Sequence, residues 1–172
     1  MSDNKNDRDD GRRDGPKDVR AILVQAARDE ARREGSRTVE AEHVLLALAA
    51  VKSSAAARLL ADAGLTEDAI RAALNREWEA GLAAAGIAVR VAELPESTPD
   101  RSRDPQIGES TKLLLHRGVE APPKHARFGP MRMLVGILAS DRGRVARALQ
   151  TGGVDRAVLH TQALQALAAG SR

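Results

Sequence analysis

Three glutamates and one histidine near the start of the chain carry side chains that could take part in chemistry. Glu30, Glu34 and Glu42 offer carboxylates of the kind used in general acid–base catalysis, and His43 directly follows Glu42. No pattern of a nucleophile with its base accompanies them, and catalytic sites are defined by geometry that spacing alone does not supply. The sequence therefore favours a protein that is not an enzyme, and it assigns no catalytic residue.

The remaining histidines and the absence of cysteine argue against a metal site. His116, His125 and His160 are scattered and show neither a His-x-x-x-His nor a Glu-x-x-His arrangement. A chain without cysteine has no disulfide, thiolate nucleophile or cysteine-ligated zinc. The G-x-x-x-x-G-K-[ST] loop that cradles ATP phosphates is also missing. We therefore expect no metal and no cofactor, and we interpret His43 as a structural histidine bonded to the backbone or to a neighbouring side chain.

The elements that must position these residues form an internal repeat. Residues 42–65 correspond without a gap to residues 131–154, so that Leu60, for example, corresponds to Leu149. Repetition over this length indicates one helical unit that is used twice.

Composition and spacing predict an all-α fold. Apolar residues make up 42% of the chain and aromatic residues 1%, so the core must be built from Ala, Leu, Val and Ile. Chains rich in Ala and Leu, with short Gly or Pro interruptions, favour closely packed helices. The apolar spacing predicts helices at about residues 17–34, 40–51, 53–63, 66–82, 109–117, 130–138, 143–151 and 155–168. These segments form two four-helix repeats.

Three local features add detail to this pattern. Trp78 falls on the apolar stripe of the fourth helix and Val158 on that of the last helix, so both are predicted to lie in the core. The run Ile87–Val91 is the longest stretch of alternating β-branched residues, and it could form a short strand against the bundle.

The chain divides into a charged tail and one folded domain. Residues 1–15 have no large apolar side chain after Met1, so we expect them to be disordered. The folded domain is expected at 16–169, with a first repeat at 17–85, a proline-containing linker at 86–107 and a second repeat at 108–169. No helix shows a heptad seam, which predicts a monomer.

The charge pattern argues against nucleic acid as a partner. The net charge is +3, and the arginines are interleaved with Asp and Glu instead of gathering on one face. A small basic helical regulator of nucleic acid is the alternative, with phosphate contacts from Arg12-Arg13, Arg32-Arg33-Arg37 and Arg142-Arg144-Arg147. The sequence shows no N-terminal apolar leader and no run of membrane-spanning length, which predicts no membrane association and a cytoplasmic location.

One set of motifs resembles a known family. Glu42-His43 opens a Leu-rich helix, Ala56-Ala57-Arg58-Leu59-Leu60 follows, and Gly64-Leu65 comes next. In this order and spacing they resemble the N-terminal repeat domain of Clp ATPases of the ClpA/ClpC type, over roughly residues 17–167. The resemblance implies a compact, pseudo-symmetric bundle of eight helices that stands alone, without AAA+ ATPase modules.

The same resemblance implies a docking function. In that family the domain is the platform for adaptors and substrates, it can bind phosphorylated arginine in ClpC-like members, and certain peptide antibiotics target it. The resemblance therefore implies a non-enzymatic module whose partners are proteins or peptides: a Clp ATPase, its adaptors or its substrates. Such a module would dock these partners or sequester Clp-targeting peptides, and so modulate Clp-dependent proteolysis.

Glu42 is the main site residue that the resemblance implies. It corresponds to the family glutamate that recognises the guanidinium of phosphoarginine, and a carboxylate can make a bidentate, charge-assisted pair with that group. A nearby helix N-terminus can help to hold the phosphate. The alternative is that Glu42 only complements the helix dipole. Lys17 occupies the position of a family threonine and could contact the phosphate.

The second repeat departs from the family pattern. Met131 and Arg132 stand where the second glutamate and its neighbouring histidine would be, so at most one such site is expected. Phe128, Met131 and Arg132 could instead form an apolar docking surface, since methionine suits adaptable binding surfaces. Their helical spacing and the scarcity of aromatic residues favour packing in the core over this docking surface.

Overall fold

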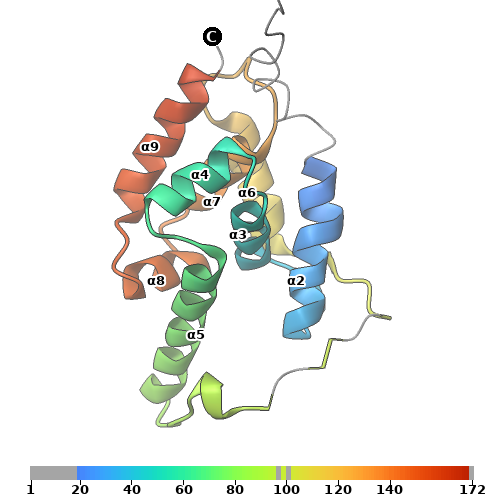
Figure 1. The fold of residues 1–172 in the computed structure, drawn as a ribbon, viewed down its shortest axis with the longest axis vertical. Coiled ribbons are helices and arrows are strands. Elements are labelled where there is room, and N and C mark those ends of the chain that lie inside the picture. Colours follow the sequence, from blue (N-terminus) through green and yellow to red (C-terminus); the bar gives the residue numbers. More distant parts are fainter. Residues whose placement is uncertain (1–18, 96–97, 100–101, 171–172) are drawn as a thin grey trace, which may run out of the picture.

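The computed structural model describes residues 19–95, 98–99 and 102–170, and this part of the chain forms an all-α bundle (Figure 1). The first repeat contains η1 (Ala21–Ala26), which continues into α2 (Ala27–Glu34), then α3 (Ala41–Ala50), α4 (Ala55–Asp62) and α5 (Glu67–Ala84). The second contains α6 (Glu109–Glu120), α7 (Pro130–Leu138), α8 (Arg144–Thr151) and α9 (Arg156–Ala169). The predicted fold of two four-helix repeats is confirmed. The tail predicted at 1–15 and Lys17 lie outside the described residues.

Local signals place most helix ends where the sequence predicts them. Ser54 Oγ accepts a hydrogen bond from the amide of Ala57, and Thr66 Oγ1 accepts one from Ala69, so these hydroxyls begin α4 and α5. Gly64 follows α4 with a φ of 75°, a left-handed conformation that glycine adopts without a steric penalty.

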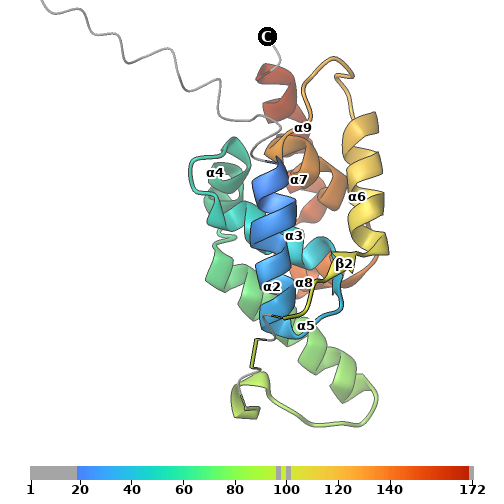
Figure 2. The same cartoon turned by 90° about the vertical axis from the view of Figure 1, so that its right-hand side faces the viewer.

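The two equivalent helices α3 and α7 form the centre of the molecule. Every residue from Glu42 to Leu48 is buried, and so is every residue from Pro130 to Leu138. A helix that is covered on all sides belongs to the interior of a bundle. Figure 2 shows α2 lying across α3, with α6 on the other side of the bundle from α4.

A close helix crossing joins α6 to α7. A Cβ atom added at Gly136 would lie 2.0 Å from the carbonyl oxygen of Leu114, and one at Gly118 would lie 2.5 Å from that of Arg132. The helix predicted at about residues 109–117 runs past Gly118 to Glu120. The glycine is needed at this position because the backbones of α6 and α7 approach too closely for a side chain.

A short parallel strand pair, which the sequence analysis did not predict, connects the two repeats. β1 (Thr38–Val39) pairs with β2 (Gln106–Ile107), so the end of the predicted linker belongs to this sheet. The pair brings the starts of α3 and α6 together. Ser110 Oγ accepts a hydrogen bond from the Ala41 amide at 2.8 Å, and the Glu40 carboxylate accepts one from the Ser110 amide at 3.1 Å. Each repeat thus supplies a cap for a helix of the other.

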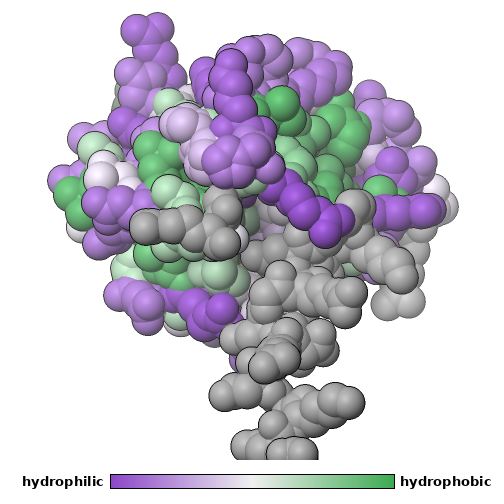
Figure 3. Space-filling model, turned by 90° about the horizontal axis from the view of Figure 1, so that it is seen from above, coloured by the Kyte–Doolittle hydropathy of each residue, from purple (hydrophilic) through white to green (hydrophobic). Residues whose placement is uncertain are grey.

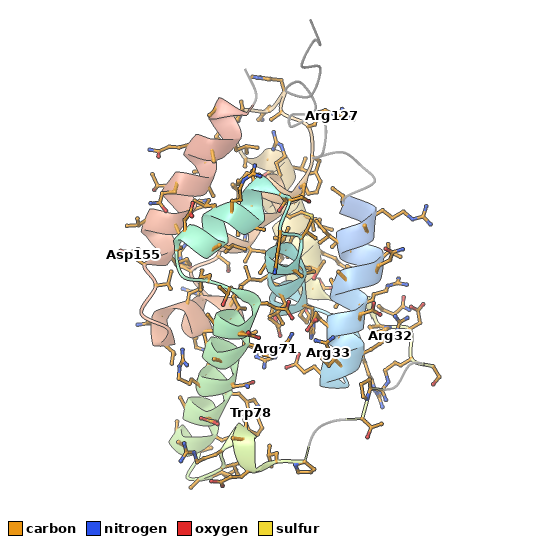
Figure 4. All side chains as sticks on the ribbon, in the orientation of Figure 1. Arg32, Arg33, Arg71, Trp78, Arg127 and Asp155 are labelled. Carbon is orange, nitrogen blue, oxygen red and sulfur yellow. The ribbon has the colours of Figure 1, made fainter. Side chains whose placement is uncertain are left out.

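The predictions for Trp78, Val158 and the run Ile87–Val91 are wrong. The second half of α5 extends beyond the other helices (Figures 1 and 4), so Trp78 is 37% exposed. Val158 is 53% exposed on α9. The run at 87–91 forms no strand and leads into the short 3-10 helix η2 (Val91–Glu93), where Glu79 Oε1 accepts a hydrogen bond from the Val91 amide at 2.6 Å. Side-chain spacing does not reveal whether a neighbouring element is present to bury the stripe.

The surface mixes apolar and polar side chains. Seen from the end of the bundle at the top of Figure 1, hydrophobic patches lie between hydrophilic ones (Figure 3). Within the described residues, no single helix has the length and apolar composition of a membrane span; α3 and α4 reach them only together, as a pair bent by 96°.

Candidate functional site

The start of α3 places two ionisable side chains inside the bundle. Glu42 is 8% exposed, and His43 beside it is fully buried. His43 Nδ1 accepts a hydrogen bond from the Glu40 amide at 2.9 Å, so its proton lies on Nε2, which is 2.6 Å from Glu34 Oε2. The interpretation of His43 as a structural histidine is confirmed, because both ring nitrogens serve to fix the start of α3.

Arg144 reaches this region from the second repeat. Its Nη1 atom lies 2.6 Å from Glu34 Oε1 and 3.1 Å from Glu42 Oε1. Its Nε atom is buried, has no hydrogen-bond partner in the described part of the chain, and lies 3.8 Å from Glu77 Oε2. Arg147, one turn further along α8, donates from Nε to Glu77 Oε1 at 2.6 Å.

We call this group the Arg144 cluster. Its members are Glu34, Glu42, His43, Glu77, Arg144 and Arg147. They come from α2, α3, α5 and α8, so the cluster connects three helices of the first repeat to one of the second. Chemically, it is a set of carboxylates that hold a guanidinium group.

The charges within the Arg144 cluster stabilise the ionised forms of Glu34 and Arg144. Burial raises the pKa of Glu34, but the hydrogen bond from His43 and the charge of Arg144 outweigh this effect and lower that pKa to about 2. Burial lowers the pKa of Arg144, and the charges and hydrogen bonds of Glu34 and Glu42 outweigh it, so the net direction is upward. Both groups are therefore ionised at neutral pH.

A second ion-pair group lies between α2 and α5. Glu30 contacts Arg71 at 2.9 Å and Arg33 at 3.2 Å, and Arg71 also contacts Glu67 at 2.8 Å. Figure 4 shows Arg33 and Arg71 pointing into the space between the two helices. Glu30, which the sequence offered as an acid or base, is thus part of a helix–helix contact.

The docking surface predicted at Phe128, Met131 and Arg132 is not exposed. Met131 is 6% exposed, Arg132 is 2% exposed, and Phe128 is half-buried against the core. The Arg132 guanidinium donates hydrogen bonds to five backbone carbonyls, those of Gly118, Val119, Ala121, Pro123 and Ala126. The residues pack in the core, as the sequence analysis favoured, and Arg132 fastens the turn after α6 to α7. Burial lowers the pKa of Arg132.

The groups expected to hold a phosphate are not assembled at Glu42 among the described residues. The Ala41 amide at the start of α3 already donates to Ser110 Oγ, and the Glu40 side chain caps the same turn. Lys17 lies outside the described residues. Two backbone amides at the start of α3, those of Ala41 and His43, are therefore already bonded to protein side chains.

Of the arginines proposed as contacts to nucleic acid, Arg12 and Arg13 lie outside the described residues, and four of the other six are paired with acids. Arg32 contacts Asp29 at 2.9 Å, Arg33 contacts Glu30, and Arg144 and Arg147 belong to the Arg144 cluster. This pairing reduces the positive charge that α2 and α8 present to a phosphate backbone. Within the described ranges, no group of three or more His, Asp or Glu residues has an arrangement suited to a metal ion.

The sequence motif proposed Glu42 as a site residue but did not connect it with Arg144 and Glu77. Arg144 was considered only as a phosphate contact. A signal was present: the first-repeat position equivalent to Arg144 is Ala55, so this arginine is a difference between the repeats. Its role could be seen only once α8 was placed against α5.

One known family matches the first repeat of the chain and the strand pair and helix α6 that follow it. The Clp repeat (R) N-terminal domain family matches residues 18–122, which is more than half of the chain. No curated protein matches. The matched segment runs from the first helix through the strand pair to α6, and it contains Glu34, Glu42 and Glu77. Since the architecture is also the two-repeat helical bundle, the chain belongs to the Clp repeat N-terminal domain family.

Proposed function

We propose that this protein is a non-enzymatic module that binds peptide or protein partners and thereby modulates Clp-dependent proteolysis. Domains of this family are interaction domains that bind proteins or peptides. A bundle of short packed helices also offers side chains from several elements to one partner. The partner classes are a Clp ATPase, its adaptors or its substrates.

Glu42 is the residue that we propose for ligand recognition. One observation supports this most directly: the buried Glu42 carboxylate contacts a guanidinium, that of Arg144, at 3.1 Å. The position is therefore suited to arginine chemistry, in which a carboxylate accepts charge-assisted hydrogen bonds from the guanidinium fork. The proposed ligand is a peptide that carries phosphoarginine, and Lys17 is proposed as a contact to its phosphate.

Calorimetric titration with free phosphoarginine tests the ligand. The native protein should bind, and Glu42→Gln should not, because the amide keeps the shape of the side chain but loses its charge. Glu30→Gln is the matched control, since Glu30 is also paired with arginines but lies between α2 and α5. If the native protein and Glu42→Gln bind phosphoarginine with equal affinity, Glu42 is not part of the binding site.

A pull-down from the cell extract of the source organism tests the partner class. Tagged native protein should recover a Clp ATPase, an adaptor or a Clp substrate, and the same protein unfolded by heat should not. Recovery of none of these by the folded protein would contradict a role in Clp-dependent proteolysis.

A further inference from the structure

The Glu42 carboxylate is already engaged by the protein itself. Arg144 Nη1 is shared between Glu34 and Glu42, and the contact to Glu34 is the shorter, at 2.6 Å against 3.1 Å. Arg144 is the ion-pair partner of Glu42 within the described residues. A ligand that carries a guanidinium group and approaches Glu42 therefore finds the guanidinium of Arg144 already bound to this carboxylate.

The surrounding contacts show that Arg144 is held by more than Glu42. Arg147 contacts Glu77 Oε1, and this contact places the other oxygen of Glu77 3.8 Å from Arg144 Nε. Nη1 of Arg144 remains shared between Glu34 and Glu42. His43 holds the other oxygen of Glu34. If Arg144 releases Glu42, it keeps its contact to Glu34, so the exchange does not require an arginine to leave the bundle.

We propose that Arg144 is an intramolecular occupant of the Glu42 site, which closes the site in the free protein and must move before a guanidinium ligand binds. This inference rests on the function proposed for Glu42. It adds that the second repeat regulates the site of the first through Arg144. The equivalent position of the first repeat holds an alanine, Ala55. For a ligand that binds only the open form, the apparent Kd equals the Kd of the open form divided by the fraction of molecules in which the site is open.

Titration of phosphoarginine into three variants of the 172-residue chain tests the proposal. Arg144→Gln removes the occupant, and we expect it to bind phosphoarginine at least about tenfold more tightly than the native protein, which corresponds to a site that is open in a tenth of native molecules. Arg71→Gln is the matched control: it removes an arginine that is likewise shared between two carboxylates, those of Glu30 and Glu67, but lies outside the Arg144 cluster, and its affinity should equal the native value. The double variant Arg144→Gln/Glu42→Gln should lose binding.

The outcomes separate this inference from the proposed function. If the native protein and Arg144→Gln bind equally and Glu42→Gln abolishes binding, the function of Glu42 stands and the occupant role is wrong. Weaker binding by Arg144→Gln would also overturn the inference, because Arg144 would then hold the ligand. If no variant binds, the proposed function itself fails.

A more conservative variant at position 144 shows that a change in affinity does not arise from misfolding. Arg144→Lys keeps a positive charge beside Glu34 but lacks the planar fork that spans two carboxylates. It should bind phosphoarginine with an affinity between those of the native protein and Arg144→Gln, while its circular dichroism spectrum remains native. A folded Arg144→Lys protein with native affinity would contradict the proposal.

Discussion

At the scale of single residues, the half-buried Arg144 and the buried Arg132 have opposite surroundings. Arg144 lies among carboxylates that come from three other helices, whereas Arg132 faces only backbone carbonyls among its hydrogen-bond partners. The first arrangement surrounds a guanidinium with charged acceptors, and the second cannot be broken without leaving several backbone acceptors without a donor. Sequence alone ranks these arginines equally, because it shows neither the partner nor the burial.

Replacing Arg132 should destabilise the protein. Arg132→Met leaves several buried carbonyls without donors, and we expect a loss of about 2–4 kcal/mol in the free energy of unfolding. Arg127→Met is the control, since Arg127 lies on the surface of the same connection (Figure 4) and should change stability by less than about 0.5 kcal/mol. Urea unfolding measures both, and similar midpoints would argue against a role for Arg132 in holding the turn.

Glu34 should make stability depend on pH in the acidic range. Its pKa of about 2 in the folded state lies below the ordinary 4.5, so its contribution is present above pH 4.5 and is lost as the pH falls towards 2. The full difference corresponds to roughly 3 kcal/mol, and we reduce it to about 1–2 kcal/mol because the side chain is 42% exposed.

Urea unfolding at a series of pH values measures this effect. Glu34→Gln should be less stable than the native protein at pH 7 and should show a flatter decline between pH 4.5 and 2. Glu109→Gln, which removes an exposed glutamate, should keep the native slope. Parallel curves for the native protein and Glu34→Gln would show that the cluster does not lower the pKa of Glu34.

At the scale of elements, the helices follow from local patterns, but their contacts do not. Thr66 and Ser54 begin helices and Gly64 ends one, as their side-chain chemistry predicts. Gly118 has the appearance of a helix breaker in sequence, yet it lies inside α6 where α7 comes closest. Trp78 has helical spacing but lies on the half of α5 that extends beyond the other helices, and it is 37% exposed. Both errors arise because packing partners are not encoded in local periodicity.

The α6–α7 crossing should not tolerate a methyl group. Gly136→Ala places a Cβ within 2.0 Å of the Leu114 carbonyl oxygen, so the two helices must separate, and we expect a loss of about 2–3 kcal/mol or more. Gly81→Ala in α5 is the control: nothing lies within 4 Å of its added Cβ, and it should stabilise the protein by about 0.5–1 kcal/mol. Thermal unfolding that shifts in the same direction for both variants would contradict the close crossing.

At the scale of the whole molecule, the repeats are joined by more than their apolar faces. The strand pair and the exchanged caps Glu40 and Ser110 connect the first repeat to α6, and the Arg144 cluster connects it to α8. Burial raises the pKa of Glu40, but its hydrogen bonds to Ser110 and Thr38 outweigh this, so the net shift is downward. We therefore expect the two repeats to unfold as one cooperative unit.

A double-mutant cycle tests the exchanged caps. Glu40→Ala and Ser110→Ala should each cost about 1–2 kcal/mol, and the double variant should lose less than the sum, because both changes break the same contacts. Asp155→Ala removes a cap within α9 and should be additive with Glu40→Ala. Additive losses for Glu40 and Ser110 would mean that the caps act independently.

The amino-acid sequence by itself determined the class of fold, the duplication and the position of nearly every helix, because apolar periodicity, caps and glycine stops act over a few neighbouring residues. It also pointed to Glu42 through the motif around it. Only the tertiary structure decided what surrounds Glu42, since Arg144 lies 102 positions away and reaches it through the packing of α8 on the first repeat. The same holds for β1 with β2 and for the burial of Arg132. These features depend on long-range contacts, whose formation is set by how whole helices pack and not by local preference.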